Sequence, residues 1–96
     1  MEKKLLFLVN PKAGRNKSRG PLFDAESVLC QAGYLVTVHE PTAAGDAAAT
    51  AAAQGADYDL VVAVGGDGTL NETVSGLMRL EQPPLLGYLP QGLSLI

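Results

Sequence analysis

Cysteine is almost absent from this 96-residue sequence, which has a single one at Cys30. One thiol cannot form a disulfide bond within the chain, and this usage fits a protein of the reducing cytoplasm. We therefore expect Cys30 to be a buried structural thiol. Long apolar runs are absent as well, because no stretch approaches the about 20 residues that a helix needs to cross a membrane. These absences exclude a disulfide scaffold and a membrane-spanning helix.

Charged residues are also scarce, at 18% of the chain, whereas hydrophobic residues make up 47%. This balance indicates a globular domain rather than a disordered segment, and the length suits one small domain. Basic residues are nearly absent from the later sequence, since six of the seven Lys and Arg residues lie within the first nineteen positions. The net charge is −3, and we expect no nucleic-acid partner. The single histidine, His39, is typical of a surface or packing position.

Four apolar runs alternate with segments that have helical character. The runs have the lengths and residue types of β-strands and lie at residues 5–9, 34–39, 60–64 and 85–89. Helical spacing of apolar residues, or a high alanine content, predicts helices at residues 21–32, 43–54 and 69–78. Strands that alternate with helices predict a parallel sheet joined by right-handed crossovers. The expected fold is α/β, a three-layer open parallel sheet with helices on both faces, of the Rossmann-like kind.

Three polar or glycine-rich segments follow strands of this predicted sheet, at residues 10–19, 39–46 and 65–71. In open parallel sheets, ligands bind beyond the carboxyl ends of the strands, where such segments meet. The first segment contains a basic loop without any acid, formed by Lys12, Arg15, Lys17 and Arg19. Alone, this pattern is typical of a solvated surface loop. Its expected place beside the glycines at residues 65–68 makes it a candidate for contacting anions.

The segment Val64–Glu72 reads VGGDGTLNE and places three glycines directly after a buried strand. Gly65, Gly66 and Gly68 can adopt positive φ and let a ligand lie against the backbone. The next helix is expected to begin at about Thr69, so that its free N–H groups and positive dipole end point into the same space. This combination predicts an anion cradle with a phosphate as its occupant. Thr69 would either cap the helix or bond a phosphate oxygen.

Two common phosphate-binding motifs are excluded by single residues. The dinucleotide pattern G-x-G-x-x-G would need a glycine at position 71, which is Asn71. The P-loop pattern would need a glycine before Lys17 and Ser18, where the residue is Asn16. The site therefore combines backbone N–H groups of the glycine turn with basic residues from a separate loop.

Asp67 lies in the middle of the glycine turn, where a carboxylate would repel a polyphosphate. Three roles for this residue are open. A Mg²⁺ ion can bridge the carboxylate and the phosphates. The carboxylate can instead hold a hydroxyl group of the ribose or of the acceptor. The third role is a local turn that the aspartate side chain stabilises.

Two of these segments together resemble the catalytic domain of the diacylglycerol kinase family, which includes sphingosine kinases and bacterial soluble lipid kinases. They are NPKAGRNKSRG at residues 10–20 and GGDGTLNE at residues 65–72. PTAAGDA at residues 41–47 is similar to a third family segment, and the resemblance covers residues 4–92. GGDGT has close relatives in NAD kinases and phosphofructokinase-like proteins, whose N-terminal domains are similar to the expected fold. The N-P-x-x-G loop favours the lipid kinases.

The resemblance implies a kinase that uses ATP and Mg²⁺ and transfers the γ-phosphoryl group to a lipid hydroxyl, with Asp67 as the catalytic residue. By position, the implied nucleotide-binding residues are Asn10, Pro11, Lys12, Ala13, Gly14, Thr42, Gly65, Gly66, Asp67, Gly68, Thr69, Leu70, Asn71 and Glu72. No protein residue is assigned as a metal ligand. The resemblance also implies a cytoplasmic protein, peripheral to the membrane, whose lipid substrate lies at an anionic membrane surface.

The C-terminal end departs from the family pattern. Family members continue into a second, β-rich domain, and they follow the fourth strand with a turn of the type L-P-x-G-T-x-N-D. Residues 89–96 read LPQGLSLI, so that Leu93 stands where a nucleotide-contacting threonine would be. We therefore expect residues 1–96 to be a nucleotide-binding domain truncated before the second domain and inactive alone. Its apolar tail is expected to favour a homodimer or aggregate.

Two other functions stay open. An NAD-kinase-like phosphotransferase would use a similar glycine turn, but it would not need the loop that begins Asn10-Pro11-Lys12. A non-catalytic nucleotide-binding fragment, left after loss of a second domain, is favoured by the end of the chain at Ile96.

Overall fold

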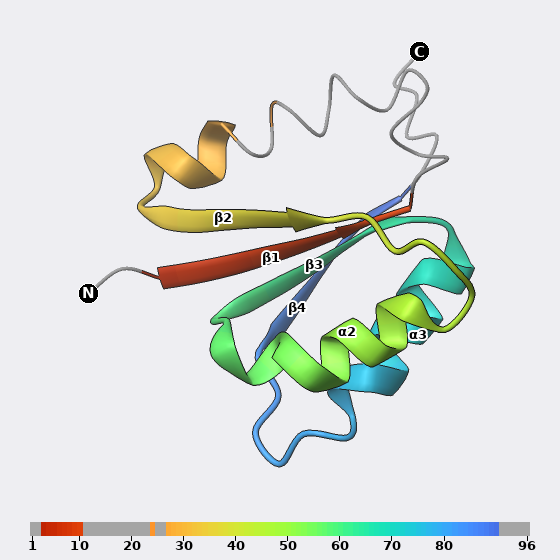
Figure 1. Cartoon of the computed structure of the whole chain (residues 1–96). Coiled ribbons are helices and arrows are strands. Elements are labelled where there is room, and N and C mark those ends of the chain that lie inside the picture. The colour runs from red at the N-terminus through yellow and green to blue at the C-terminus, as the bar shows by residue number, and fades with distance from the viewer. Residues whose placement is uncertain (1–2, 11–23, 25–26, 91–96) are drawn as a thin grey trace.

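The computed structural model describes residues 3–10, 24 and 27–90. In this part of the chain, strands alternate with helices (Figure 1). The strands are β1 (Lys3–Val9), β2 (Tyr34–His39), β3 (Leu60–Gly65) and β4 (Leu85–Pro90). The helices are α2 (Asp46–Gln54), the short 3₁₀ helix η2 (Gly55–Asp57) and α3 (Asp67–Leu77), and residues 27–31 are also helical. All four predicted strands are confirmed.

The four strands form one parallel sheet in the order β2-β1-β3-β4. β1 pairs with both β2 and β3, so that Leu5 lies opposite Val36 on one side and Leu60 on the other. Because all strands run the same way, their carboxyl ends meet at one edge of the sheet. The loops that follow β1, β2 and β3 therefore start from the same edge.

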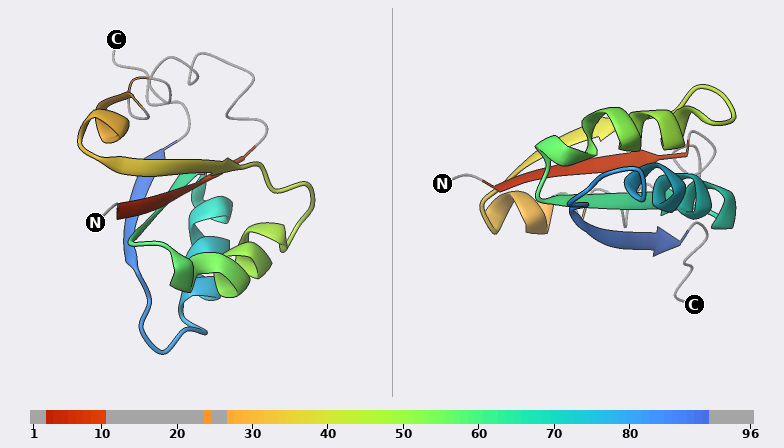
Figure 2. Two further views of the ribbon diagram at one scale, coloured as in Figure 1. Left: turned by 60° about the vertical axis from the view of Figure 1, so that its left-hand side comes forward. Right: turned by 90° about the horizontal axis from the view of Figure 1, so that it is seen from below.

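The sheet is covered on both faces, and this explains the unbroken apolar runs of its central strands. Residues 5–9 of β1 are all buried, and successive side chains point to opposite faces. One face carries a buried cluster of Leu5, Phe7, Val9, Val62 and Val64, with Leu29 from the helical residues 27–31 packed against it. The other carries Leu6, Leu8 and Val61, with Ala51 of α2 and Leu77 of α3. Figures 1 and 2 show the helices on opposite sides of the sheet, which confirms the predicted three layers.

α2 and α3 lie side by side on one face of the sheet (Figure 1). Gly76 of α3 is buried against the backbone of Ala48 and the side chain of Ala51, both in α2. A Cβ atom at position 76 would lie only 2.8 Å from Cβ of Ala51. The alanine-rich composition of α2 therefore serves close helix packing, which brings the starts of the two helices to the same edge of the sheet.

The helices α2 and α3 each begin at a different residue from the predicted one. α2 begins at Asp46 rather than residue 43, because Gly45 has φ of 86° and interrupts helical geometry. α3 begins at Asp67, two residues before the predicted start at Thr69. Gly66 is its N-cap in an extended conformation, with φ of −94° and ψ of −169°. Asp67 and Gly68 thus belong to the first helical turn rather than to the loop.

Two further comparisons with the sequence predictions concern Cys30 and membrane spans. Cys30 is exposed, so the prediction of a buried thiol is wrong. The helix around it contributes Leu29 to the core and leaves its neighbour facing solvent. Residues 21–23 and 25–26 of the predicted first helix lie outside the described residues. Within the described ranges, the helices are too short or too polar to cross a bilayer.

Candidate functional site

The glycine turn at the end of β3 is packed between β1, β4 and α3. Gly65 is buried and has φ of 151°, a conformation that side-chain-bearing residues rarely adopt. A Cβ atom there would lie 2.8 Å from Oγ1 of Thr69 and 2.9 Å from Cβ of Asn10. The hydroxyl of Tyr88 donates a hydrogen bond of 3.2 Å to the Gly65 carbonyl. The fold itself therefore requires glycine at position 65.

The two other glycines of the turn, Gly66 and Gly68, are not required by the fold in the way that Gly65 is. Gly66 has negative φ, which any residue can adopt, so the backbone does not require glycine there. A Cβ atom added at Gly68 would meet no atom of the described residues within 4 Å. Of the three glycines, which were all expected to permit positive φ, only Gly65 adopts it. The absence of a side chain at position 68 leaves space beside the start of α3.

Asn10 joins the end of β1 to the glycine turn. Its backbone N–H donates to the carbonyl of Val64 at 2.9 Å, and its side-chain amide donates to Oγ1 of Thr69 at 3.3 Å. Thr69 is 8% exposed and is not the helix cap that was one of its two predicted roles. Its carbonyl accepts a 2.8 Å bond from the Thr73 hydroxyl. Asn10 and Thr69 therefore fix the spacing between β1 and α3.

The N-terminus of α3 borders the open space beside Gly68. The first intrahelical bond runs from the Leu70 N–H to the Gly66 carbonyl at 3.2 Å. The N–H groups of Asp67, Gly68 and Thr69 therefore have no acceptor within the helix, which is the usual arrangement of an anion-binding helix end. Asn71, in the same first turns, is exposed.

Asp67 is the first residue of α3, and its side chain is exposed. A carboxylate at this position interacts favourably with the positive end of the helix dipole. The N-cap residue, Gly66, has no side chain, and no hydrogen bond of the Asp67 carboxylate is found among the described residues, so nothing there supports a turn that this aspartate closes. Among the described residues there is no group of three or more His, Cys, Asp or Glu side chains that could hold a metal ion. Asp67 could contribute one carboxylate to a metal whose other ligands are phosphate oxygens.

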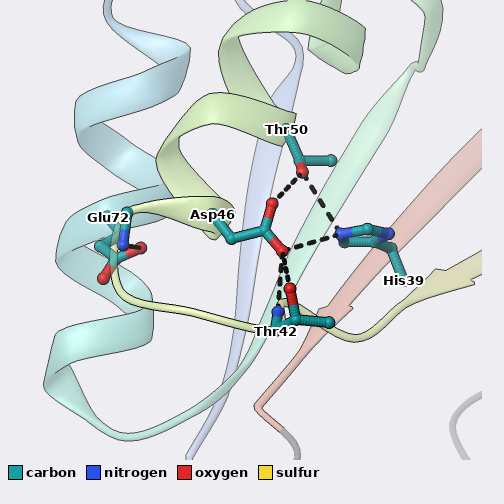
Figure 3. A network of polar contacts seen from close by, with 6 residues as sticks. His39, Thr42, Asp46, Thr50 and Glu72 are labelled. Atoms are coloured by element: carbon teal, nitrogen blue, oxygen red, sulfur yellow. Dashed lines mark hydrogen bonds and ion pairs between the residues drawn. The ribbon is translucent and has the colours of Figure 1, made fainter.

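A second polar network orders the loop between β2 and α2 (Figure 3). Oδ2 of Asp46 accepts hydrogen bonds from the backbone N–H of Thr42 at 2.8 Å and from its hydroxyl at 3.3 Å. Oδ1 of Asp46 accepts a bond of 3.3 Å from the Thr50 hydroxyl. Nε2 of His39 lies 3.7 Å from Oδ2 of Asp46 and 3.3 Å from Oγ1 of Thr50. The Asp46 carboxylate therefore joins Thr42 of the loop to Thr50 of α2.

These contacts lower the pKa of Asp46 below the ordinary value of an aspartate. The hydrogen bond from the Thr42 N–H is the main cause. Partial burial opposes it, while the charge of His39 and the hydroxyls of Thr50 and Thr42 add to the lowering. The carboxylate form is therefore the one that the folded loop stabilises.

Asp46→Asn should remove a pH-dependent part of the stability. Because the folded pKa lies below the unfolded value of about 3.9, the wild-type advantage should be complete above that value. It should be lost as the pH falls through the lowered pKa of the folded protein. Thermal unfolding of both proteins between neutral and strongly acidic pH measures this difference. Asp57→Asn, at an exposed position in η2, is the control. A difference between wild type and Asp46→Asn that did not change with pH would contradict the assignment.

Glu72 connects this loop to the glycine-turn helix. Its Oε1 accepts a hydrogen bond of 3.1 Å from the backbone N–H of Gly45, 27 residues away in the sequence. Glu72 was predicted as a nucleotide-binding residue, and the structure places its carboxylate on the Gly45 backbone (Figure 3). Asp46 was not predicted as a site residue at all. Its spacing of four residues from both Thr42 and Thr50 is a signal that could have indicated it.

The structure thus brings together residues from three of the predicted segments at the carboxyl edge of the sheet. Asn10 contacts Thr69 at the glycine turn, and Gly45 of the Thr42 loop contacts Glu72 of α3. Four of the predicted nucleotide contacts lie outside the described residues: Pro11, Lys12, Ala13 and Gly14. The same holds for the rest of the basic loop and for the tail at residues 91–96.

Comparisons with known proteins point to a single family. The family model described as the diacylglycerol kinase catalytic domain matches residues 4–94. A diacylglycerol kinase of Bacillus subtilis (strain 168) is 42% identical over 93 residues, which cover 94% of this chain and 30% of that protein. One of Staphylococcus aureus (strain MRSA252) is 38% identical over 93 residues, covering 96% of this chain and 30% of that protein.

A solved structure gives the same result. The crystal structure of a diacylglycerol kinase from Bacillus anthracis str. Sterne matches with a TM-score of 0.79 and 35% identity. The match covers 95% of this chain and 33% of that one. The chain therefore spans about a third of the length of the relatives that it matches.

Proposed function

Because the chain belongs to the diacylglycerol kinase catalytic domain family, we propose that it is the ATP-binding domain of a lipid kinase. The observation that supports ATP binding is the open helix end at Asp67–Thr69, which includes or adjoins two glycines, Gly66 and Gly68, whose backbone angles do not require glycine. Backbone N–H groups and small residues together suit a polyphosphate. The proposal also includes Thr42 and residues 10–14 in the adjoining loops, which match the family segments.

In this proposal, the segment from Gly65 to Asn71 holds the phosphates, and Thr42 with residues 10–14 contacts the rest of the nucleotide. Lys12 and the other basic residues of that loop add positive charge near the phosphates. Mg²⁺, when bound between Asp67 and the phosphates, would neutralise charge that develops during transfer. Asp67 would act there as the catalytic residue, by holding either that ion or a hydroxyl group.

The acceptor side of the reaction is proposed from the family alone. The relatives are about three times as long as this chain, and we propose that a second domain supplies the lipid-binding part. The acceptor would be a lipid hydroxyl, such as that of diacylglycerol, at an anionic membrane surface, with the protein cytoplasmic and peripheral to the membrane. Transfer needs the acceptor held in line with the γ-phosphate and shielded from water. The 96 residues alone should therefore bind nucleotide without turnover, and a homodimer is one expected form of the isolated chain.

Nucleotide titration of this chain tests the proposal. ATP and ADP should bind with 1:1 stoichiometry and more tightly than NAD by at least about tenfold, because the site is built for a polyphosphate end. Isothermal calorimetry measures both, and Gly68→Leu, which fills the space above the helix start, is the matched variant that should lose ATP binding. Tighter binding of NAD than of ATP would contradict the proposed ATP-binding function.

A further inference from the structure

The loop between β2 and α2 is held from two sides by carboxylates. Asp46, at the start of α2, bonds the backbone and hydroxyl of Thr42. Glu72, on α3, bonds the backbone N–H of Gly45. The bonds to the two N–H groups measure 2.8 and 3.1 Å, within the normal range for hydrogen bonds. The loop position is therefore tied to two different helices rather than to its own helix alone.

The Glu72 bond has a consequence for the glycine turn. Glu72 lies on the same helix that begins at the turn, six residues after Gly66. Six helical residues span about 9 Å and form a rigid connection. A displacement of the start of α3 would move Glu72 and, through Gly45, the loop that carries Thr42. The structure thus couples the two segments to which the proposed function assigns the phosphates and the rest of the nucleotide.

We propose that Glu72 is a positioning residue, which sets the place of the Thr42 loop relative to the glycine turn through the Gly45 N–H. This inference rests on the proposed function, because it concerns the site that ATP would occupy. It replaces a direct contact between Glu72 and the nucleotide. The Glu72 carboxylate already accepts a hydrogen bond from a backbone N–H group, and its charge would be unfavourable beside a polyphosphate.

The two roles of Glu72 differ in the chemistry that they need. Positioning needs only an oxygen that accepts a hydrogen bond from Gly45, and the amide oxygen of glutamine can provide it. A role through a metal ion or a ribose hydroxyl depends on the negative charge. Glu72→Gln should therefore behave like the wild type if Glu72 is a positioning residue, whereas Glu72→Ala should not.

The expected loss in Glu72→Ala follows from preorganisation. If the loop occupies the binding position in only about a tenth of the molecules, the apparent affinity for ATP falls about tenfold. Alanine is the best helix former, so the variant should keep α3 and fold normally. Glu81→Ala, at an exposed glutamate beyond the end of α3, is the matched control and should bind ATP like the wild type.

Two measurements on the 96-residue chain test the inference. Amide NMR spectra of the wild type and the Glu72 variants report on the Gly45 N–H directly, in the absence of any ligand. Its proton resonance should move upfield in Glu72→Ala and stay close to the wild-type position in Glu72→Gln. Calorimetric titration with ATP should give about tenfold weaker binding for Glu72→Ala and near-normal binding for Glu72→Gln.

The outcomes separate this inference from the proposed function. Equal losses of ATP affinity in Glu72→Gln and Glu72→Ala, with normal binding by the wild type, would show a direct charged contact and overturn the positioning role alone. An unchanged Gly45 resonance in Glu72→Ala would overturn it as well. If the wild-type chain bound neither ATP nor ADP, the proposed function would fail, and the positioning role would fail with it.

Discussion

Replacing Gly65 with alanine should destabilise the fold by about 3 kcal/mol, the sum of two separate costs. The first is backbone strain, because φ of 151° at this buried position costs a residue with a side chain about 1–3 kcal/mol. The second is overpacking, since the new Cβ would lie 2.8 Å from Oγ1 of Thr69 and 2.9 Å from Cβ of Asn10. Overpacking of this kind costs about 1–3 kcal/mol. A small domain has only about 5–15 kcal/mol of total stability, so this loss is severe.

Urea denaturation measures the effect, and Gly68→Ala is the matched glycine-to-alanine control in the same turn. Gly68 lies in the first turn of α3, and a Cβ atom there meets nothing within 4 Å in the described part of the chain. This control should gain up to about 1 kcal/mol, because alanine is the better helix former. If Gly65→Ala unfolded at the same urea concentration as the wild type, the assigned backbone conformation at position 65 would be wrong.

The central strands illustrate what the sequence could predict. Residues 5–9 and 60–64 are unbroken apolar runs, and this pattern is typical of strands that are covered on both faces. Their order with the intervening helices then left few topologies, because parallel strands need crossover connections. The parallel sheet and its three layers followed from these patterns, and the structure confirms them.

The helix starts were harder to predict from local sequence. Gly66 and Gly68 favour a loop by propensity, yet α3 already begins at Asp67. The helix can include Asp67 and Gly68 because its first two turns are anchored by Thr69 and Thr73, which are both buried. Tertiary packing therefore overrode the local preference.

The polar network around the Thr42 loop depends on contacts that no local pattern encodes. Glu72 and Gly45 are 27 residues apart, and only the close packing of α2 on α3 brings them together. The sequence placed Thr42 and Glu72 in a nucleotide site by resemblance. It could not show that the Glu72 carboxylate meets a backbone N–H group, because many exposed acids have the same local sequence environment.

Asp67→Asn should separate catalysis from stability. In a catalytically competent protein that carries this chain, turnover should fall by at least about 100-fold, the usual contribution of a metal-holding or proton-accepting carboxylate. The free energy of unfolding should fall by less than about 1 kcal/mol, because Asp67 is exposed and its main structural contact is with the helix dipole. Transfer of labelled phosphate from ATP to diacylglycerol, measured beside urea denaturation, gives both numbers.

The two chemical roles of Asp67 predict different responses to Mg²⁺. If the carboxylate holds the ion, Asp67→Asn should need a higher Mg²⁺ concentration for half-maximal turnover, and excess Mg²⁺ should restore part of the activity, because the phosphates still bind the ion. If the carboxylate instead accepts the proton of a hydroxyl group, excess Mg²⁺ should restore nothing, since asparagine cannot accept that proton. Asp57→Asn, exposed on η2 at the start of β3, should show normal turnover at every Mg²⁺ concentration. Near-normal turnover of Asp67→Asn would show that Asp67 has no catalytic role. The start of α3 would then serve only to bind the phosphates.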